Sequence, residues 1–223
     1  MLLLKHIAAQ LPNRWQNELK RIHFGKQIKK GTFVTNEPEF MILHNFIAAG
    51  DWVLDIGANV GHYTKKFSEL VGDHGRVIAF EPVPTTFSLL CANVQLFSYP
   101  NVSLINAAVS NKLSVVGMTL PKFSTGLTNY YQAHVSSEED SELSVITLSL
   151  DSLFINQRIA LIKIDTEGHE SFVLDGMQKL IKKYHPVLII ETDSIEVIAN
   201  LKSSGYFSEK LQNSPNVLFR PNL

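Results

Sequence analysis

Short apolar runs bounded by turn residues recur along the chain. Five of them are nearly continuous and rich in β-branched residues: 52–56, 76–80, 102–105, 159–164 and 186–190. This composition is typical of strands that are buried on both faces of a sheet. Between them, apolar residues return every three or four positions over 63–71, 85–97 and 171–184, which predicts three helices. Strand alternating with helix predicts an α/β fold built on a doubly wound, parallel sheet.

Two regions depart from this alternation. Residues 113–150 have no helical period, and their two ends, 113–120 and 143–150, have the pattern of strands. The acidic stretch 136–142 between them is expected to be a solvated loop. Residues 205–219 are predicted to form a final strand pair around the turn Asn213-Ser214-Pro215.

Length and charge limit the domain organisation. The 223 residues, 45% of them hydrophobic, favour a single domain with a core of normal size. The net charge of −1 excludes a basic field over the whole chain, but the charge is unevenly distributed. Residues 1–30 hold seven basic residues and one acidic residue, whereas 31–223 hold thirteen and twenty. We therefore expect a basic, helical leader over 1–34 and one globular domain over 35–223, with 113–150 as an insert of strands and a loop.

The cellular compartment is inferred from the number of cysteines and from the hydropathy of the chain. The lone Cys91 cannot form an intramolecular disulfide, which suits a reducing environment. The opening Met-Leu-Leu-Leu is interrupted by Lys5 and His6 before a signal peptide can form, and no span of ~18 uncharged apolar residues follows. We expect a cytoplasmic protein with no transmembrane segment.

The segment 53–64 runs from a predicted strand through a glycine turn into a helix, which is typical of a nucleotide site. Its glycines, Gly57 and Gly61 with Asn59 between them, do not match the GxGxxG pattern of dinucleotide sites. Asp55 would repel a pyrophosphate but suits a ligand that is cationic here, such as S-adenosylmethionine. Glu81, at the end of the next strand, stands where a carboxylate accepts hydrogen bonds from ribose hydroxyls.

Four segments together resemble the FkbM family of S-adenosylmethionine-dependent methyltransferases: 55–61, 79–82, 150–153 and 162–170. The last reads Ile-Lys-Ile-Asp-Thr-Glu-Gly-His-Glu and is the most specific of the four. The resemblance extends over about residues 35–220. It implies a Rossmann-like class I methyltransferase fold, with seven strands of which the last is antiparallel and helices on both faces. It also implies O-methylation of hydroxyls on sugars and natural products.

The resemblance assigns cofactor contacts by position. The methionine part is assigned to Asp55, Gly57, Asn59 and Gly61, and the ribose to Glu81. Adenine-side contacts are assigned to the residues after the third strand, including Asn106 and Ala107. The neighbouring Tyr63, Thr64 and Pro82 complete the predicted cofactor set, together with Asp165.

The end of the fourth long strand gathers ionisable groups: Asp165, Glu167, His169 and Glu170, opposite Glu191 and Asp193. Methyl transfer to a hydroxyl requires alignment of the reacting atoms and a group that accepts the proton. We predict Asp165, Glu167 and His169 as catalytic residues, His169 being the candidate base. Glu170 is also explained as the acidic residue of a helix's first turn. Carboxylates with an imidazole can bind magnesium or manganese, but they also serve a cofactor directly, so no metal site is predicted.

The acceptor is expected to be a hydroxyl of a small molecule or glycan. Residues 35–40 are predicted to begin a helix capped by Asn36, which in the family covers the cofactor and would turn Glu39 towards the site. The basic residues of the leader, interleaved with Trp15 and Phe24, are expected to form a solvated helix face. Contact with an anionic membrane or with RNA is the alternative, and nucleic acid is the less favoured partner. An RNA methyltransferase and a non-catalytic nucleotide-binding protein are the alternative functions, and no pattern indicates the oligomeric state.

Overall fold

The computed structural model describes residues 11–123, 128–129, 132–136 and 141–222. The interrupted apolar start at 1–6, with Lys5, lies outside the described residues. So does most of the acidic loop, at 137–140.

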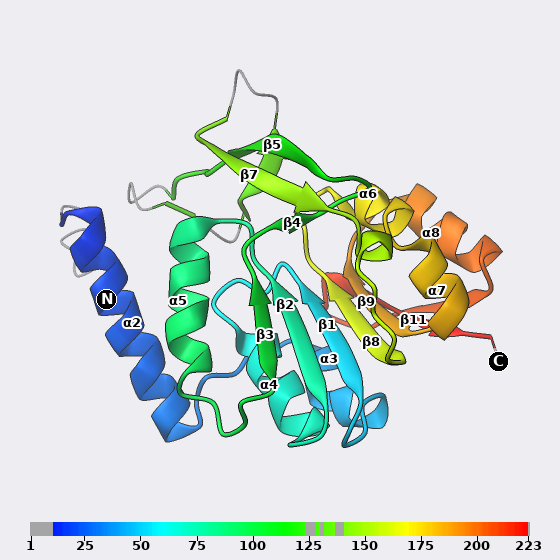
Figure 1. Ribbon diagram of the computed structural model, residues 1–223, viewed down its shortest axis with the longest axis horizontal. Helices are drawn as coiled ribbons and strands as arrows, with labels where there is room; N and C mark the ends of the chain where they lie inside the picture. The colour runs from blue at the N-terminus through cyan, green and yellow to red at the C-terminus, as the bar shows by residue number, and fades with distance from the viewer. Residues whose placement is uncertain (1–10, 124–127, 130–131, 137–140, 223) are drawn as a thin grey trace.

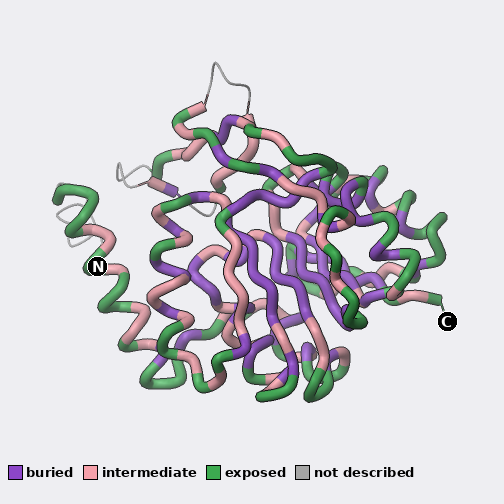
Figure 2. Tube along the Cα trace, viewed as in Figure 1, coloured by how far each residue is buried: buried purple, intermediate pink, exposed green. Residues whose placement is uncertain are grey.

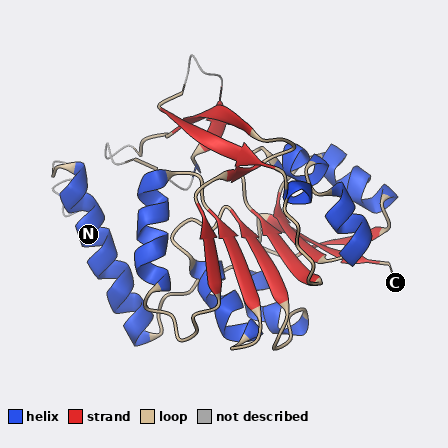
Figure 3. Ribbon diagram, in the orientation of Figure 1, coloured by secondary structure: helices blue, strands red, loops and turns tan. Residues whose placement is uncertain are grey.

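A seven-stranded sheet forms the centre of the molecule (Figures 1 and 3). Its strands are β1 (Trp52–Ile56), β2 (Arg76–Phe80), β3 (Val102–Ile105), β8 (Ile159–Ile164), β9 (Val187–Glu191), β10 (Tyr206–Lys210) and β11 (Asn216–Pro221). Their order is β10-β11-β9-β8-β1-β2-β3. β11 pairs antiparallel with both neighbours, and the other described pairings in this sheet are parallel. The predicted sheet, with the last strand antiparallel, is confirmed.

Alternate residues of the central strands bury opposite faces of the sheet (Figure 2). Leu54 and Ile162 contribute to one apolar cluster, and Val53 and Leu161 to another. The first face is covered by α6 (Glu170–Asp175), α7 (Gln178–Tyr184) and α8 (Ile195–Ser203). The second is covered by α3 (Pro38–Ile42), the 3₁₀ turn η1 (Leu43–Asn45), α4 (His62–Val71) and α5 (Pro84–Val94). Because both faces are covered, the central strands are mostly apolar.

The single helix predicted over 171–184 is wrong. The chain instead forms α6 and α7, separated at Gly176-Met177. A Cβ atom on Gly176 would lie 1.9 Å from the carbonyl oxygen of Ser110, so a neighbouring segment passes directly against the break. The apolar spacing is the same on both sides of the break, and the sequence pattern therefore did not reveal it.

The insert forms part of a second, smaller sheet above the carboxyl ends of the main strands (Figure 1). It consists of β4 (Ala108–Val109), β5 (Ser114–Thr119), β6 (His134–Ser136) and β7 (Leu143–Leu148), in the order β4-β7-β5-β6. Its inward residues Ala108, Met118 and Val145 pack on Val83 of the main body. The 3₁₀ turn η4 (Leu150–Ser152) then leads into β8. The second sheet is thereby fixed over the edge where the main strands end.

The leader contains helix α2 (Asn13–Lys30), which ends at Gly31 in the left-handed conformation. α2 packs against α5, and its Phe24 and Ile28 contact Phe33 and Leu89. Within the described part of the chain, no helix combines the length and apolar character needed to span a membrane.

Candidate functional site

The carboxyl ends of β1, β2, β8 and β9 meet at one edge of the sheet. They bring together Gly57, Glu81, Asp165 and Glu191, which are far apart in the sequence. In open α/β sheets ligands bind at this edge, where the strand order reverses. Here β1 lies between β2 and β8, so the reversal falls beside Gly57.

Gly57 allows the loops after β1 and β8 to touch. Its φ is 79°, and a Cβ atom there would lie 1.8 Å from the carbonyl oxygen of Asp165. The Asp165 amide donates to the carbonyl of Ile56 at 3.0 Å. Asn59 also has a positive φ, 49°, which asparagine tolerates better than most residues. The glycine turn is thus a close backbone contact that holds Asp165 beside the turn.

Two cavities open on either side of this turn. The first, of about 280 Å³, lies under the second sheet and is lined by residues that include Glu81, Pro82, Ala107, Glu167 and His169. The second, of about 530 Å³, is lined by residues that include Asp55, Tyr63 and Lys163. Glu37, Gly57, Asn59 and Asp165 line both cavities. The shared lining makes them two parts of one elongated site.

Asp55 is a buried carboxylate whose Oδ2 accepts a hydrogen bond from the Thr64 hydroxyl at 2.5 Å. Burial raises the pKa of Asp55 to about 6, although the Thr64 hydrogen bond and the Lys163 ammonium act in the opposite direction. Thr64 is itself fully buried and lines neither cavity, so its observed contact is with Asp55. This hydrogen bond fixes the Asp55 carboxylate at the wall of the second cavity.

Glu81 holds the turn from the opposite side. Its Oε2 accepts from the amide of Asn59 at 2.9 Å, and its Oε1 accepts from the amide of Val83 at 2.9 Å. Burial raises the pKa of Glu81 to about 7, despite these two hydrogen bonds. Each carboxylate oxygen has a further lone pair, so the group can accept additional hydrogen bonds from a ligand.

Lys163 is a site residue that the sequence analysis missed. It is 2% exposed on β8, and its Nζ lies 2.9 Å from Oδ2 of Asp165 and 4.6 Å from the ring centre of Tyr63. Burial alone would lower the pKa of Lys163, but the carboxylates of Asp165 and Asp55 raise it above its ordinary value. The available signal was a lysine within an otherwise apolar strand, since lysine is almost never fully buried without a charged partner.

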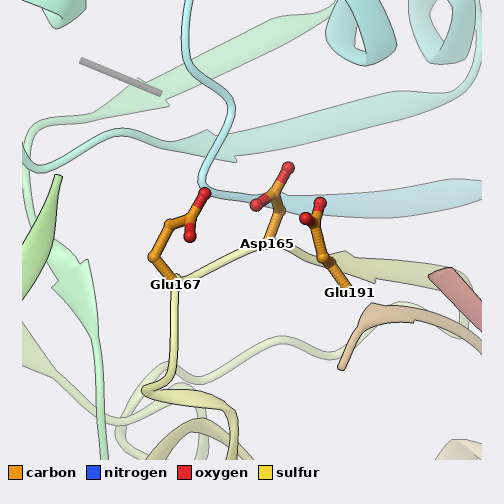
Figure 4. Close-up of side chains that lie close together, drawn as sticks. All are labelled: Asp165, Glu167 and Glu191. Atoms are coloured by element: carbon orange, nitrogen blue, oxygen red, sulfur yellow. The ribbon is translucent and has the colours of Figure 1, made fainter. Parts of the chain in front are cut away.

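Three carboxylates converge over the ends of β8 and β9 (Figure 4). Asp165, Glu167 and Glu191 place one oxygen each within 4.8 Å of one another. Burial, and then the nearby Asp165 charge, raise the pKa of Glu191 to about 7, and the same causes raise the pKa of Glu167. Burial and the neighbouring negative charge thus favour the protonated forms of Glu191 and Glu167. The spacing also suits a divalent cation, a role that the residue types alone left open.

His169 lines the first cavity but is not part of the three-carboxylate group. Its Nε2 lies 2.9 Å from the Ser110 hydroxyl, and its ring stacks on Phe172 with centroids 4.7 Å apart. Burial lowers the pKa of His169, which favours the neutral form of its ring. Glu170 accepts from the Gly168 amide and the Thr166 hydroxyl, each at 2.9 Å, which accounts for it as a residue of the helix start.

Other predicted residues lie outside the cavities. Gly61 precedes α4, and Asn106 donates to the carbonyls of Glu81 and Pro82 at 2.8 and 3.0 Å. Both therefore shape the loops that carry cavity residues. Asp193 pairs with Lys210 and is 91% exposed, away from the carboxylate group.

Two predictions for residues 35–40 are wrong. The residue before the helix is Glu37 and not Asn36, since Pro38 is the first residue of α3. Glu39 is buried and contacts Tyr63, Ser214 and Asn216, so it does not face the cavities. Glu37 takes that place and accepts a hydrogen bond from the Tyr63 hydroxyl.

The fold and the strand-end site define a class I methyltransferase architecture. The model of the methyltransferase FkbM domain matches residues 55–207. The chain therefore belongs to the FkbM methyltransferase family, and both the predicted family and the predicted fold class are confirmed.

Comparison with solved structures supports the fold. Methyltransferase FkbM from Methylobacillus flagellatus matches with a TM-score of 0.57 and 16% identity, over 76% of this chain and 43% of that one. The chain thus spans less than half of that protein. A Streptococcus mutans protein in complex with S-adenosylhomocysteine matches with a TM-score of 0.50 and 11% identity, over 81% and 93% of the two chains. No curated protein has a significantly similar sequence.

Proposed function

We propose that this protein transfers a methyl group from S-adenosylmethionine to a hydroxyl of a sugar or another small molecule. The observation that carries this proposal is the elongated site at the strand ends, with Asp55 on one side of the Gly57 turn and Glu81 on the other. These two carboxylates are the groups that a cationic amino-acid part and a ribose require.

The residues present fit this cofactor. In the second cavity, Asp55 and Asp165 suit the ammonium of the methionine part, and Lys163 suits its carboxylate. In the first cavity, Glu81 suits the ribose hydroxyls, while Pro82, Val83 and Ala107 offer an apolar wall for adenine. Asn59 lines both cavities.

S-adenosylmethionine, when bound, supplies a methyl group that is electrophilic because it is attached to a sulfonium. The chain's own work is then to orient the acceptor and take its proton. Asp165, Glu167 and His169 line the first cavity and are the proposed catalytic residues. His169 can accept a proton in the neutral form that burial favours, and Glu191 is a second acceptor because its pKa is close to 7.

The acceptor is proposed to bind between this polar group and the second sheet. Met118, Ala133 and Val135 form an apolar wall opposite the carboxylates. A sugar offers both surfaces, since its hydroxyls bind carboxylates and its C–H faces pack on apolar side chains. This is the physical basis for placing a polyhydroxylated acceptor here.

Two ligands that differ in the amino-acid part test the cofactor assignment. S-adenosylhomocysteine carries the carboxylate, whereas 5′-methylthioadenosine lacks it. Lys163→Met is expected to weaken S-adenosylhomocysteine at least tenfold, since a charged hydrogen bond contributes ~1.5–3 kcal/mol, and to leave methylthioadenosine within about twofold. Equal losses for both ligands, with an intact circular dichroism spectrum, would contradict the placement of the carboxylate at Lys163.

The acceptor class is tested by methyl transfer from isotopically labelled donor to a panel of sugars and phenols. Labelled methyl ethers support the proposal. Cofactor binding with no transfer to any hydroxyl would favour the non-catalytic alternative, and label found only in RNA would favour the RNA methyltransferase.

A further inference from the structure

Helix α2 presents a single row of outward residues whose chemistry changes along its length. Trp15, Leu19, Ile22, Lys26, Lys29 and Lys30 follow one another at steps of one, three or four, so they lie on one side of the helix. Trp15, Leu19 and Ile22 are 54%, 49% and 47% exposed, and the three lysines are exposed as well. We call these six residues the outer row: apolar in its first half and basic in its second.

The opposite side of α2 is already occupied. Phe24 and Ile28 face the body of the protein and pack on Phe33, so Phe24 is not available to a partner. α2 lies at the edge of the molecule, outside α5, and its outer side is mostly exposed (Figures 1 and 2). The outer row is therefore a convex ridge and not a groove.

The charges of the outer row have no internal partner among the described residues. None of Lys26, Lys29 and Lys30 forms an ion pair with another described side chain, and Glu18 pairs with Arg21. Arg14 adds a further cation and lies over the Trp15 ring at 5.6 Å. An exposed tryptophan beside a cation, on a helix that also presents lysines, is typical of surfaces that lie at the boundary between lipid headgroups and acyl chains.

A second copy of α2 does not complement this row. A parallel pairing of two such helices places lysines against lysines, and an antiparallel pairing places lysines against Leu19 and Ile22. RNA would complement the lysines but would leave the apolar half facing phosphates. An anionic bilayer complements both halves, because it offers acyl chains below a negatively charged headgroup layer.

We propose that the outer row of α2 binds the surface of an anionic lipid bilayer. The apolar half enters the headgroup boundary and the three lysines contact lipid phosphates. This interaction does not depend on the proposed methyl transfer, and its test uses no activity measurement.

The test is flotation of the full-length protein with two kinds of vesicle, phosphatidylcholine alone and phosphatidylcholine with about one third phosphatidylglycerol. Binding is expected to the second kind only, and to decrease as salt shortens the screening length. Lys26→Glu/Lys29→Glu/Lys30→Glu is expected to weaken binding roughly a hundredfold, since each basic residue near such a surface contributes about fivefold. The matched control, Lys179→Glu/Lys182→Glu/Lys183→Glu on α7, changes the net charge equally and should retain at least a third of the wild-type affinity.

A spectroscopic readout separates insertion from attraction by net charge. Brominated anionic lipid should quench the fluorescence of Trp15 in the wild type, and the quenching should be lost in Trp15→Phe, which retains Trp52. Three results would overturn the proposal. The first is no binding to anionic vesicles at low salt. The second is an equal loss of vesicle affinity in the α2 and α7 variants. The third is that substitutions in the outer row abolish self-association or RNA binding instead of vesicle binding.

Discussion

Replacing Glu81 by glutamine separates the effect of this carboxylate on the stability of the fold from its effect on cofactor binding. In the free protein, Glu81 accepts hydrogen bonds from two backbone amides and is buried. Its pKa is raised from 4.5 to about 7, which corresponds to roughly 3 kcal/mol of disfavoured ionisation at ~1.4 kcal/mol per unit. The pKa of Glu81 is higher in the folded protein than in the unfolded one. The free energy of unfolding therefore falls as pH rises from about 4.5 to 7, and Glu81 causes no further fall above pH 7.

Glutamine removes the ionisation penalty but replaces one accepting oxygen with an NH₂ group that faces a backbone N–H. Leaving that donor unsatisfied costs ~1–3 kcal/mol. The free energy of unfolding of Glu81→Gln should therefore be ~0–2 kcal/mol above that of the wild type at pH 8 and ~1–3 kcal/mol below it at pH 4.5, measured by urea denaturation. Cofactor affinity should fall ~10–100-fold at pH 8, because a charged acceptor for ribose hydroxyls is lost.

Asp151 provides a matched control. It also accepts from two backbone amides, those of Lys179 and Leu180, each at 2.9 Å, but lines neither site cavity. Asp151→Asn should destabilise the fold and leave the affinity for S-adenosylhomocysteine unchanged within about twofold of wild type. The reasoning is refuted if folded Glu81→Gln binds S-adenosylhomocysteine as tightly as the wild type at pH 8.

Three further predictions follow from the same geometry. Gly57→Ala should destabilise the fold by several times the ~1–2 kcal/mol that its positive φ alone costs, because the new Cβ meets the Asp165 carbonyl. The control is Gly205→Ala, since Gly205 has a φ of 86° and open space around it, so thermal unfolding of this variant measures the cost of the positive φ alone. Affinity for S-adenosylhomocysteine should rise roughly tenfold or more between pH 5.5 and 7.5, because Asp55 and Glu81, with pKa values of about 6 and 7, must ionise to bind it; a flat calorimetric profile would be inconsistent with this. Turnover with an identified acceptor should survive excess EDTA if the three carboxylates act without a metal, and a loss restored by magnesium would assign them as ligands.

The parts of the fold that follow from local pattern were predictable. Buried strands have apolar runs, and a strand that leads into a glycine turn before a helix is typical of a nucleotide site. Asp55, Gly57 and Glu81 could therefore be predicted from the sequence to lie at neighbouring strand ends, where they line the cavities. Sheet topology then places the carboxyl ends of these strands together. Those inferences needed only the spacing of apolar residues along the chain and the chemistry of a few side chains.

The remaining features depend on contacts between distant segments. The break between α6 and α7 is set by the Ser110 backbone against Gly176, and the apolar wall of the first cavity is set by Met118 and Val135 through the pairing of β5 with β6. The spacing of apolar residues within one segment does not indicate these contacts. Lys163 was overlooked for a different reason, since it lies within a run that is otherwise apolar and that predicts a buried strand. A buried charge in such a strand is itself a signal of a site.

Calorimetric titration of the wild-type protein with S-adenosylhomocysteine tests whether the strand-end cavities bind a methyl donor. We expect saturable 1:1 binding at pH 8 that weakens in Asp55→Asn and in Glu81→Gln. Absence of binding by a protein that is shown to be folded would contradict the assignment of the strand-end cavities to a methyl donor.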